Sequence, residues 1–316
     1  MLLNPYRFLS SGVMSTYLAA ATASGVTGPR FYDTTSYASE VNLTSYTGSS
    51  NWTCAWSPDG AYFALGTSAG GNVYVWRTSD WTAVTIASNP TSKVFHLVFS
   101  PDSSMLAVGF QASPRIRVYQ TSDWSAKADP ASLPSGTVVG VSFSADSSKL
   151  SVSCAGDTIK IYNTSNMTVV SGTPADNTQN QTVFTNDGLY FVTGRSSAPY
   201  LRVYSTSTWG LAATPTTSGM NGPARRMVIS PDGNWLALST STQTVHVFNT
   251  ATWDQITLPA MALVAVVSVS FSNDSKFLAV ASNNTTGYII EVSGWTVSQT
   301  LTGNTPQGQE IAYSPF

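Results

Sequence analysis

An internal repeat constrains the fold of this chain more than any other feature. A turn of the type Ser57-Pro58-Asp59-Gly60 returns, with variations, about every 43 residues. Its acidic residue is Asp59, Asp102, Asp146, Asp187, Asp232 and Asp274 in turn. A second marker keeps the same spacing at Trp76, Tyr119, Tyr162, Tyr204, Phe248 and Ile290. Such spacing is typical of folds in which one small unit is stacked on copies of itself.

Each repeat predicts four short strands. In the second repeat, a first strand ends at Val98-Phe99, and runs at 106–108 and 116–119 predict the second and third strands. A fourth strand opens at Trp124. In the turn, proline fixes φ and glycine supplies a positive φ. Four strands in roughly 40 to 45 residues is the period of a β-propeller blade.

The two chain ends supply one more blade. Residues 16–41 align with the second, third and fourth strands of a repeat, which places Tyr32 where Trp76 lies. The missing first strand is found in 310–315, which match 53–58. We therefore predict an all-β fold, a single seven-bladed β-propeller over 15–316, with blade seven closed by three N-terminal strands and one C-terminal strand. Closure removes the open edges of a sheet.

The repeats resemble those of WD-repeat and related β-propellers over nearly the whole chain. The match is closest to propeller repeats built around a Ser-Pro-Asp-Gly turn. The Gly-His and Trp-Asp pairs of the WD family do not recur in this chain, and Trp76 is followed by Arg77. The polar tetrad that those pairs form in the family is therefore not carried over. The resemblance implies the fold and leaves the function open.

Composition excludes several classes of protein and site. Only 9% of the residues are charged and the net charge is −2, which excludes a nucleic-acid binder with a basic face. Two cysteines, Cys54 and Cys154, exclude a disulfide framework and are expected to be buried small side chains. Two histidines, His96 and His246, are too few for a zinc site. We expect no metal and no cofactor.

The N-terminal segment has some features of a signal peptide. It combines an arginine, a broken apolar stretch and an Ala-x-Ala sequence. Residues 16–25 are needed as blade structure, however, so we expect no signal peptide. No apolar run approaches the roughly 18 residues of a membrane span.

The acidic residues do not predict catalysis. An aspartate that recurs in every repeat is expected to serve the turn. The remaining acids form no recognisable pair and include Glu40, Asp129, Asp157, Asp176, Glu291 and Glu310. Glycoside hydrolysis generally needs two facing carboxylates. We predict that the chain is not an enzyme, although separated acids that converge at a central channel stay as the alternative.

A series of large side chains also keeps the repeat. It consists of Trp81, Trp124, Trp209, Trp253 and Trp295, with Tyr37 and Met167 in register. Aromatic rings in a row could stack on carbohydrate. A side chain repeated at one strand position packs blade against blade more economically, and we predict that role.

Binding residues are expected where the repeats differ. Connections on one face vary in length, at 89–93, 127–136, 174–180, 215–226 and 302–309, and variable loops on a rigid scaffold are where binding usually resides. Their main charges are Arg195, Arg225 and Arg226. Residues 1–14 form an N-terminal extended arm outside the blades, with Leu2, Leu3, Tyr6, Arg7 and Phe8 as candidate partner-binding residues.

These observations favour a non-enzymatic structural and interaction module. The opening Asn4-Pro5-Tyr6-Arg7-Phe8 resembles the start of some tailed-bacteriophage virion proteins. We therefore predict a virion component, assembled in the host cytoplasm, that joins other virion proteins through the arm and contacts a host glycan or receptor through its loops. The alternatives are a propeller that binds or cleaves glycans through its channel and an intracellular protein-interaction scaffold.

Overall fold

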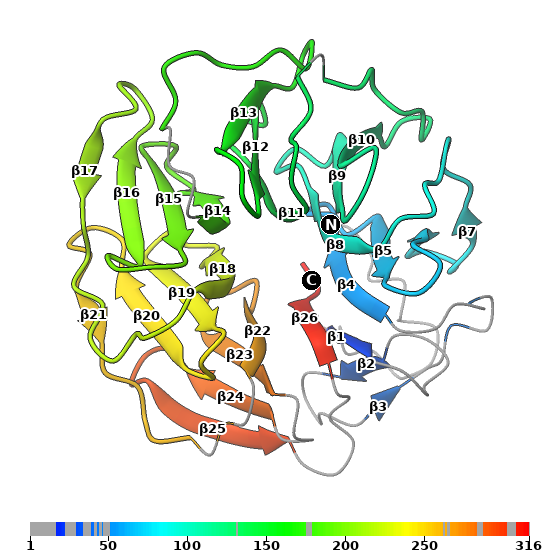
Figure 1. Cartoon of the computed structure of the whole chain (residues 1–316). Helices are drawn as coiled ribbons and strands as arrows, with labels where there is room; N and C mark the ends of the chain where they lie inside the picture. The colour runs from blue at the N-terminus through cyan, green and yellow to red at the C-terminus, as the bar shows by residue number, and fades with distance from the viewer. Residues whose placement is uncertain are drawn as a thin grey trace.

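The described part of the chain contains strands and no helix. The structure is a computed structural model and describes residues 17–22, 30–33, 39–40, 43, 46, 51–130, 132–174, 179–261, 263, 266–282, 287–301 and 308–315. Its strands form seven sheets. The sheets follow one another around a ring, each with its first strand towards the centre (Figure 1). The prediction of an all-β propeller is confirmed.

Within each sheet the strands follow one another from the centre of the ring outwards. The first three sheets are β4 (Asn51–Trp56), β5 (Tyr62–Thr67), β6 (Val73–Arg77) and β7 (Ala83–Val84); β8 (Val94–Phe99), β9 (Met105–Phe110) and β10 (Ile116–Gln120); and β11 (Val138–Phe143), β12 (Lys149–Cys154) and β13 (Lys160–Asn163). The next three are β14 (Gln179–Phe184), β15 (Tyr190–Arg195), β16 (Leu201–Ser205) and β17 (Leu211–Ala213); β18 (Ala224–Ile229), β19 (Trp235–Thr240), β20 (Val245–Asn249) and β21 (Gln255–Ile256); and β22 (Val266–Phe271), β23 (Phe277–Ser282), β24 (Gly287–Glu291) and β25 (Thr296–Leu301). The last is β26 (Gly308–Tyr313), β1 (Tyr17–Thr22), β2 (Arg30–Asp33) and β3 (Ser39–Glu40).

Two sheets have three strands instead of four. In the sheets of β8 and β11, the expected fourth strand is reduced to the single bridges Tyr119↔Ala126 and Tyr162↔Val169. The chain then leaves the edge after one or two hydrogen bonds, such as Lys127 N–H to the Val118 carbonyl at 2.8 Å. The sequence pattern predicted the start of these strands but not their early end.

The two ends of the chain meet in one sheet. Strand β26 pairs antiparallel with β1, with Leu18 opposite Tyr313 and Ala19 opposite Ala312. The predicted pairing of a C-terminal first strand with N-terminal strands is therefore confirmed. Residues 1–16 lie outside the described residues, so the predicted arm is not tested.

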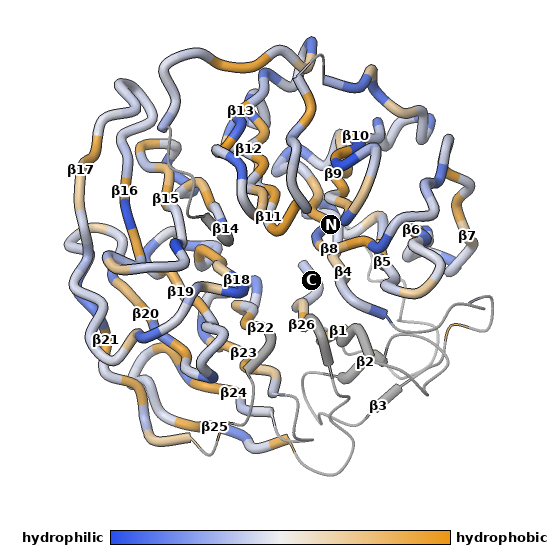
Figure 2. The backbone as a smooth tube through the Cα atoms, in the orientation of Figure 1, coloured by the Kyte–Doolittle hydropathy of each residue, from blue (hydrophilic) through white to orange (hydrophobic). Residues whose placement is uncertain are grey.

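The core lies between neighbouring sheets. The second marker of the repeat is fully or almost fully buried, as the sequence predicted, at Trp76, Tyr119, Tyr162, Tyr204, Phe248 and Ile290. Figure 2 shows apolar stretches along strands such as β11 and β12. Gly66 allows a close approach between sheets, because a Cβ there would lie 2.4 Å from Cγ1 of Val94 in the next sheet. The free cysteines Cys54 and Cys154 are buried, as expected.

Candidate functional site

We call the face that carries the Ser57–Gly60 turn and its equivalents the turn-side face. In that turn the Ser57 hydroxyl donates to Oδ1 of Asp59 at 2.6 Å, and the same oxygen accepts the Ala61 N–H at 2.9 Å. The other five repeats have the same Ser or Thr to Asp bond. Hydrogen bonds from Ser144 and Ser148 lower the pKa of Asp146 to about 2. The repeated aspartates therefore hold turns, as predicted.

The repeated aromatic series packs sheet against sheet, which confirms the predicted role. Trp124 makes an edge contact with Tyr62 of the preceding sheet at 4.9 Å between centroids. Trp253 and Trp295 contact the equivalent Tyr190 and Trp235. One feature was not predicted: all the described members have a positive φ, at Trp81, Trp124, Met167, Trp209, Trp253 and Trp295. Tyr37 lies outside the described residues.

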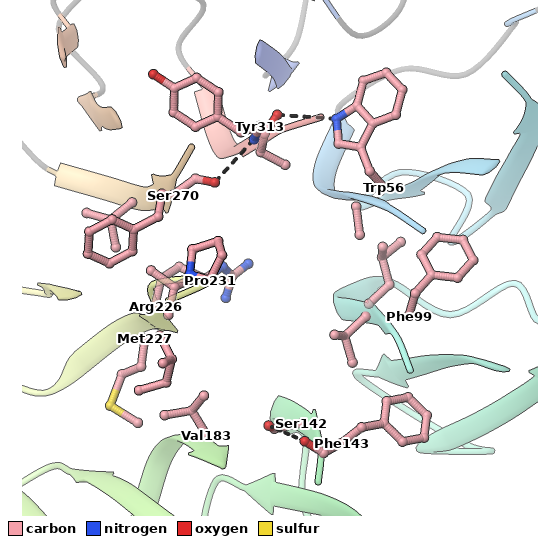
Figure 3. Close-up of a pocket in the computed structure, with 18 of the residues that line it drawn as sticks. Trp56, Phe99, Ser142, Phe143, Val183, Arg226, Met227, Pro231, Ser270 and Tyr313 are labelled. Carbon is pink, nitrogen blue, oxygen red and sulfur yellow. Dashed lines mark hydrogen bonds between the residues drawn. The ribbon is translucent and has the colours of Figure 1, made fainter. Parts of the chain in front are cut away.

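A cavity of about 400 Å³ occupies the centre of the ring. All seven innermost strands contribute to its wall, and most of the lining side chains are apolar, such as Phe99, Val183 and Met227 (Figure 3). Hydrogen bonds between side chains and backbone join neighbouring innermost strands around the cavity. The Trp56 indole N–H donates to the Ala312 carbonyl at 3.3 Å, and the Tyr313 N–H donates to the Ser270 hydroxyl at 3.2 Å.

Every innermost strand has a β-bulge near its first residue. The register against the second strand shifts between Val94 and His96 in β8, and between Ala224 and Arg226 in β18. The same shift recurs in the other five innermost strands. A bulge adds an unpaired residue and redirects side chains. The bulged residues lie at the end of the channel opposite the turns, on what we call the loop-side face.

Arg226 crosses the channel at this end. Its Nη2 donates to the Phe95 carbonyl at 3.2 Å, and its Nη1 donates to the Arg225 carbonyl at 3.3 Å. The guanidinium therefore joins β18 to β8. Arg226 is only 9% exposed and lies within a strand. Its predicted placement in a loop was wrong, because the strand begins at Ala224.

Arg195 also lies in a strand instead of a loop. It is the last residue of β15 and is 8% exposed. Its Nη1 donates to the carbonyls of Ser197 and Pro199, so the side chain holds the following loop. Arg225 is exposed at the bulge of β18. Of the three predicted arginines, only Arg225 presents its side chain at the loop-side surface.

His96 lies in the channel wall beneath Arg226. Its Nδ1 accepts the N–H of Val141 in the next sheet at 3.3 Å. Burial and then the positive charge of Arg226 hold the pKa of His96 well below its usual range. The imidazole is therefore neutral at physiological pH and acts as a hydrogen-bond acceptor between sheets.

Three half-buried side chains form a cluster beside the channel mouth. The Nζ atom of Lys93 lies 3.4 Å from the ring centroid of Trp52 and 4.7 Å from that of Phe95. The two rings meet edge to face at 5.8 Å. Trp52 and Phe95 are the bulged residues of β4 and β8. Together with Arg225 these residues are called the mouth cluster. Lys93 belongs to the variable connection 89–93 that the sequence analysis named, whereas Trp52 and Phe95 were missed because bulges leave no clear pattern in the sequence.

A second cavity of about 530 Å³ adjoins the outer strands β20 and β21. His246 is buried beside it, with Nε2 2.7 Å from the Thr244 hydroxyl and Nδ1 3.1 Å from Nε2 of Gln255. Because Nε2 of Gln255 also donates to the Ser218 carbonyl, it is the amide nitrogen, and Nδ1 of His246 is an acceptor. Burial lowers the pKa of His246.

The candidate acids are not brought together in the described part of the chain. Asp129 pairs with Arg117 at 3.4 Å, and Asp157 accepts the N–H and hydroxyl of Ser135. Glu291 is exposed on β24. Asp176 and the side chains of Glu40 and Glu310 lie outside the described residues, as do Leu2, Leu3, Tyr6, Arg7 and Phe8. Among the described residues, no group of three His, Cys, Asp or Glu side chains could hold a metal ion, and no helix is long and apolar enough to cross a membrane.

One repeat of this chain matches a model of a known protein family. The family model of the WD domain, G-beta repeat, matches residues 41–77. These residues include β4, β5 and β6, the three inner strands of one sheet. The predicted resemblance to WD-repeat propellers is thereby confirmed. A comparison with curated proteins found no match.

Proposed function

We propose that this chain is a non-enzymatic protein-interaction module whose seven sheets are the blades of one rigid ring. The observation that carries the proposal is the contrast between the two faces. Hydrogen bonds repeat from turn to turn on the turn-side face, whereas the bulged side chains described on the loop-side face differ from blade to blade, as at Trp52, Phe95 and Arg225. The similarity of one repeat to WD domains supports the same role. Recognition sites commonly lie on irregular segments of a rigid scaffold.

Paired surface variants test which face binds. Phe95→Ser with Arg225→Glu alters the loop-side face, and Leu189→Ser with Lys149→Glu makes matched changes on the turn-side face. A natural partner, trapped by cross-linking in the source cells, is then captured with each variant. We expect the first pair to lose the partner and the second to retain it. The reverse result would contradict the proposal.

A narrower proposal is that the module belongs to a bacteriophage virion and is attached by residues 1–14. Its support is the apolar character of that segment and the similarity of residues 4–8 to virion proteins. A chain that starts at Ser15 should fold normally but fail to join particles. Assembly at the full-length level would contradict attachment by the arm.

Lack of catalysis is likewise a proposal. Purified protein should release no reducing ends from capsule, lipopolysaccharide or peptidoglycan. Turnover that is abolished by replacing Glu40, Asp157 or Glu291 would instead favour the alternative, a propeller that cleaves glycans.

A further inference from the structure

We propose that the mouth cluster binds a carboxylate-rich segment of a partner protein, laid across the loop-side end of the channel. The inference deepens the proposed function by naming the chemistry of the partner. The residues of the mouth cluster are Trp52, Lys93, Phe95 and Arg225.

The cations of the cluster have no acidic partner among the residues that the structure describes. The ion pairs there are Arg77–Asp80, Arg117–Asp129 and Lys276–Asp274, and none involves Lys93 or Arg225. Arg115 lies in the adjoining loop, where its Nη1 donates to the Gln111 carbonyl and the Gln111 N–H donates to the Lys93 carbonyl. The surface is therefore complementary to negative charge.

The nearby acid does not neutralise this charge. Asp157 lies in the loop between β12 and β13, on the same face, but its carboxylate accepts hydrogen bonds from Ser135 and Thr158. Those bonds keep the carboxylate turned towards Ser135 and Thr158. Among the residues that the structure describes, no acid therefore competes with an incoming carboxylate for Lys93.

The two aromatic rings prepare Lys93 for an ion pair. Trp52 and Phe95 surround the ammonium group, and burial lowers the pKa of Lys93. Part of the dehydration that an ion pair requires has thus already taken place in the folded protein. Charges interact more strongly where water is partly excluded. The exposed edges of both rings can also cover the apolar stem of a glutamate side chain.

Arg226 fixes the spacing of the cluster. Its guanidinium donates to the carbonyls of both Phe95 and Arg225, which belong to strands on opposite sides of the ring. The two bulged residues are therefore held on either side of the channel mouth. A ligand that contacts Lys93 and Arg225 together has to cross that mouth, which suits an extended segment better than a single small anion.

A basic and aromatic surface also suits single-stranded nucleic acid. The charge balance favours a protein ligand over a nucleic acid, because the chain has 14 Lys and Arg against 16 Asp and Glu. Nucleic-acid affinity depends on neutralising several phosphates along the backbone. The two cations of the mouth cluster, Lys93 and Arg225, match a few carboxylates better than a long phosphate chain.

Fluorescence anisotropy with labelled hexaglutamate tests the inference in the full chain. The wild type should bind it, and hexaglutamine should bind at least tenfold more weakly. Lys93→Met and Arg225→Gln should each weaken binding about five- to tenfold, whereas Lys149→Met on the turn-side face should not change it. Circular dichroism melts check that each variant is folded.

Three results would overturn the inference: no binding of hexaglutamate, equal binding by Lys93→Met, or tighter binding of an oligothymidylate of the same charge. The proposed function can survive such a failure. If the natural partner is lost with Phe95→Ser and Arg225→Glu while hexaglutamate does not bind, the loop-side face is the interaction surface and the carboxylate chemistry is wrong.

Discussion

The backbone N–H of Asp59 donates to the hydroxyl of Ser103 at 3.0 Å, and this bond joins the turns of two neighbouring blades. Asp102 donates in the same way to Ser147, and Asp232 to Ser275. Each of these serines has a φ near 60°. In this left-handed conformation a side chain carries a steric cost, which the bond between blades offsets.

Two other junctions use an asparagine instead. The side-chain amide of Asn186 donates to the Ser230 carbonyl at 2.9 Å, and that of Asn273 donates to the Pro315 carbonyl at 2.8 Å. In the turn that Asn186 reaches, the left-handed position is Gly233. A serine at this position of the turn accepts a backbone N–H from the neighbouring blade. Where the position is Gly233, the bond comes from the asparagine side chain of the neighbouring blade instead.

We expect Ser103→Ala and Ser103→Gly to differ. Alanine keeps the strained φ and loses a hydrogen bond, which costs about 1 kcal/mol. Glycine loses the same bond but relieves strain of about 1 kcal/mol, so the free energy of unfolding should stay near that of the wild type. Urea denaturation measures both values.

Ser88 provides the control for this comparison. Its φ is also positive, at 52°, and no hydrogen bond to its hydroxyl occurs in the described structure. Ser88→Gly should therefore stabilise the protein. If Ser103→Gly stabilised it equally, the bond from Asp59 would contribute nothing.

Trp124 combines an unfavourable backbone with favourable packing. Its φ is 58°, its N–H donates to the Gln120 carbonyl at 2.8 Å, and its ring is buried against Tyr62. Trp124→Ala should cost about 3–5 kcal/mol through the lost packing. Trp124→Gly should cost about 1 kcal/mol less, because glycine adopts this φ without strain.

This order of the two variants reverses what a regular strand would show. Thermal and urea unfolding of both proteins give the comparison. A glycine variant less stable than the alanine variant would mean that φ at residue 124 relaxes after truncation and that strain does not contribute.

Sequence predicted the features that depend on periodicity and missed those that depend on local backbone geometry. The turns, the buried series through Trp76 and the pairing of β26 with β1 follow from one pattern repeated along the chain. The bulges at Phe95 and Arg225 do not follow from it. Each bulge lies near the first residue of its strand, so the alternation of apolar residues in the rest of the strand is unchanged. Arg226 was placed in a loop because it directly follows the bulged Arg225, and two polar residues in a row resemble a loop.

Both histidines should make stability depend on pH. Burial lowers the pKa of His96 and His246 in the folded protein, so below about pH 6.5 the unfolded chain binds more protons. The stabilisation is complete above pH 6.5 and is lost as the pH falls. The loss approaches about 1.4 kcal/mol per pH unit for each histidine.

Urea denaturation between pH 7.5 and 5 measures this slope. The range avoids the region in which Asp146, with a pKa of about 2, takes up a proton. The double variant His96→Gln, His246→Gln should show a much flatter dependence. An unchanged slope in that variant would assign the effect to other groups.

Removal of residues 310–316 should destabilise the whole ring. The deletion removes most of β26, including the pairing of Ile311 with Ala20, the Trp56 bond to Ala312 and the Asn273 bond to Pro315. It also opens the channel wall between β4 and β22. Burial of one side chain such as Ile311 contributes about 1.5–3 kcal/mol, and the whole strand therefore a large share of the roughly 5–15 kcal/mol that stabilises a domain.

We expect the truncated chain to melt well over 10 °C below the full-length protein, in proportion to such a loss. Ile311→Ala, which keeps the strand, should cause a smaller shift of a few degrees. Differential scanning calorimetry distinguishes the two, because a ring that opens loses cooperativity as well as melting temperature. A truncated protein that melts with the full-length chain would show that β26 frays without effect on the other blades.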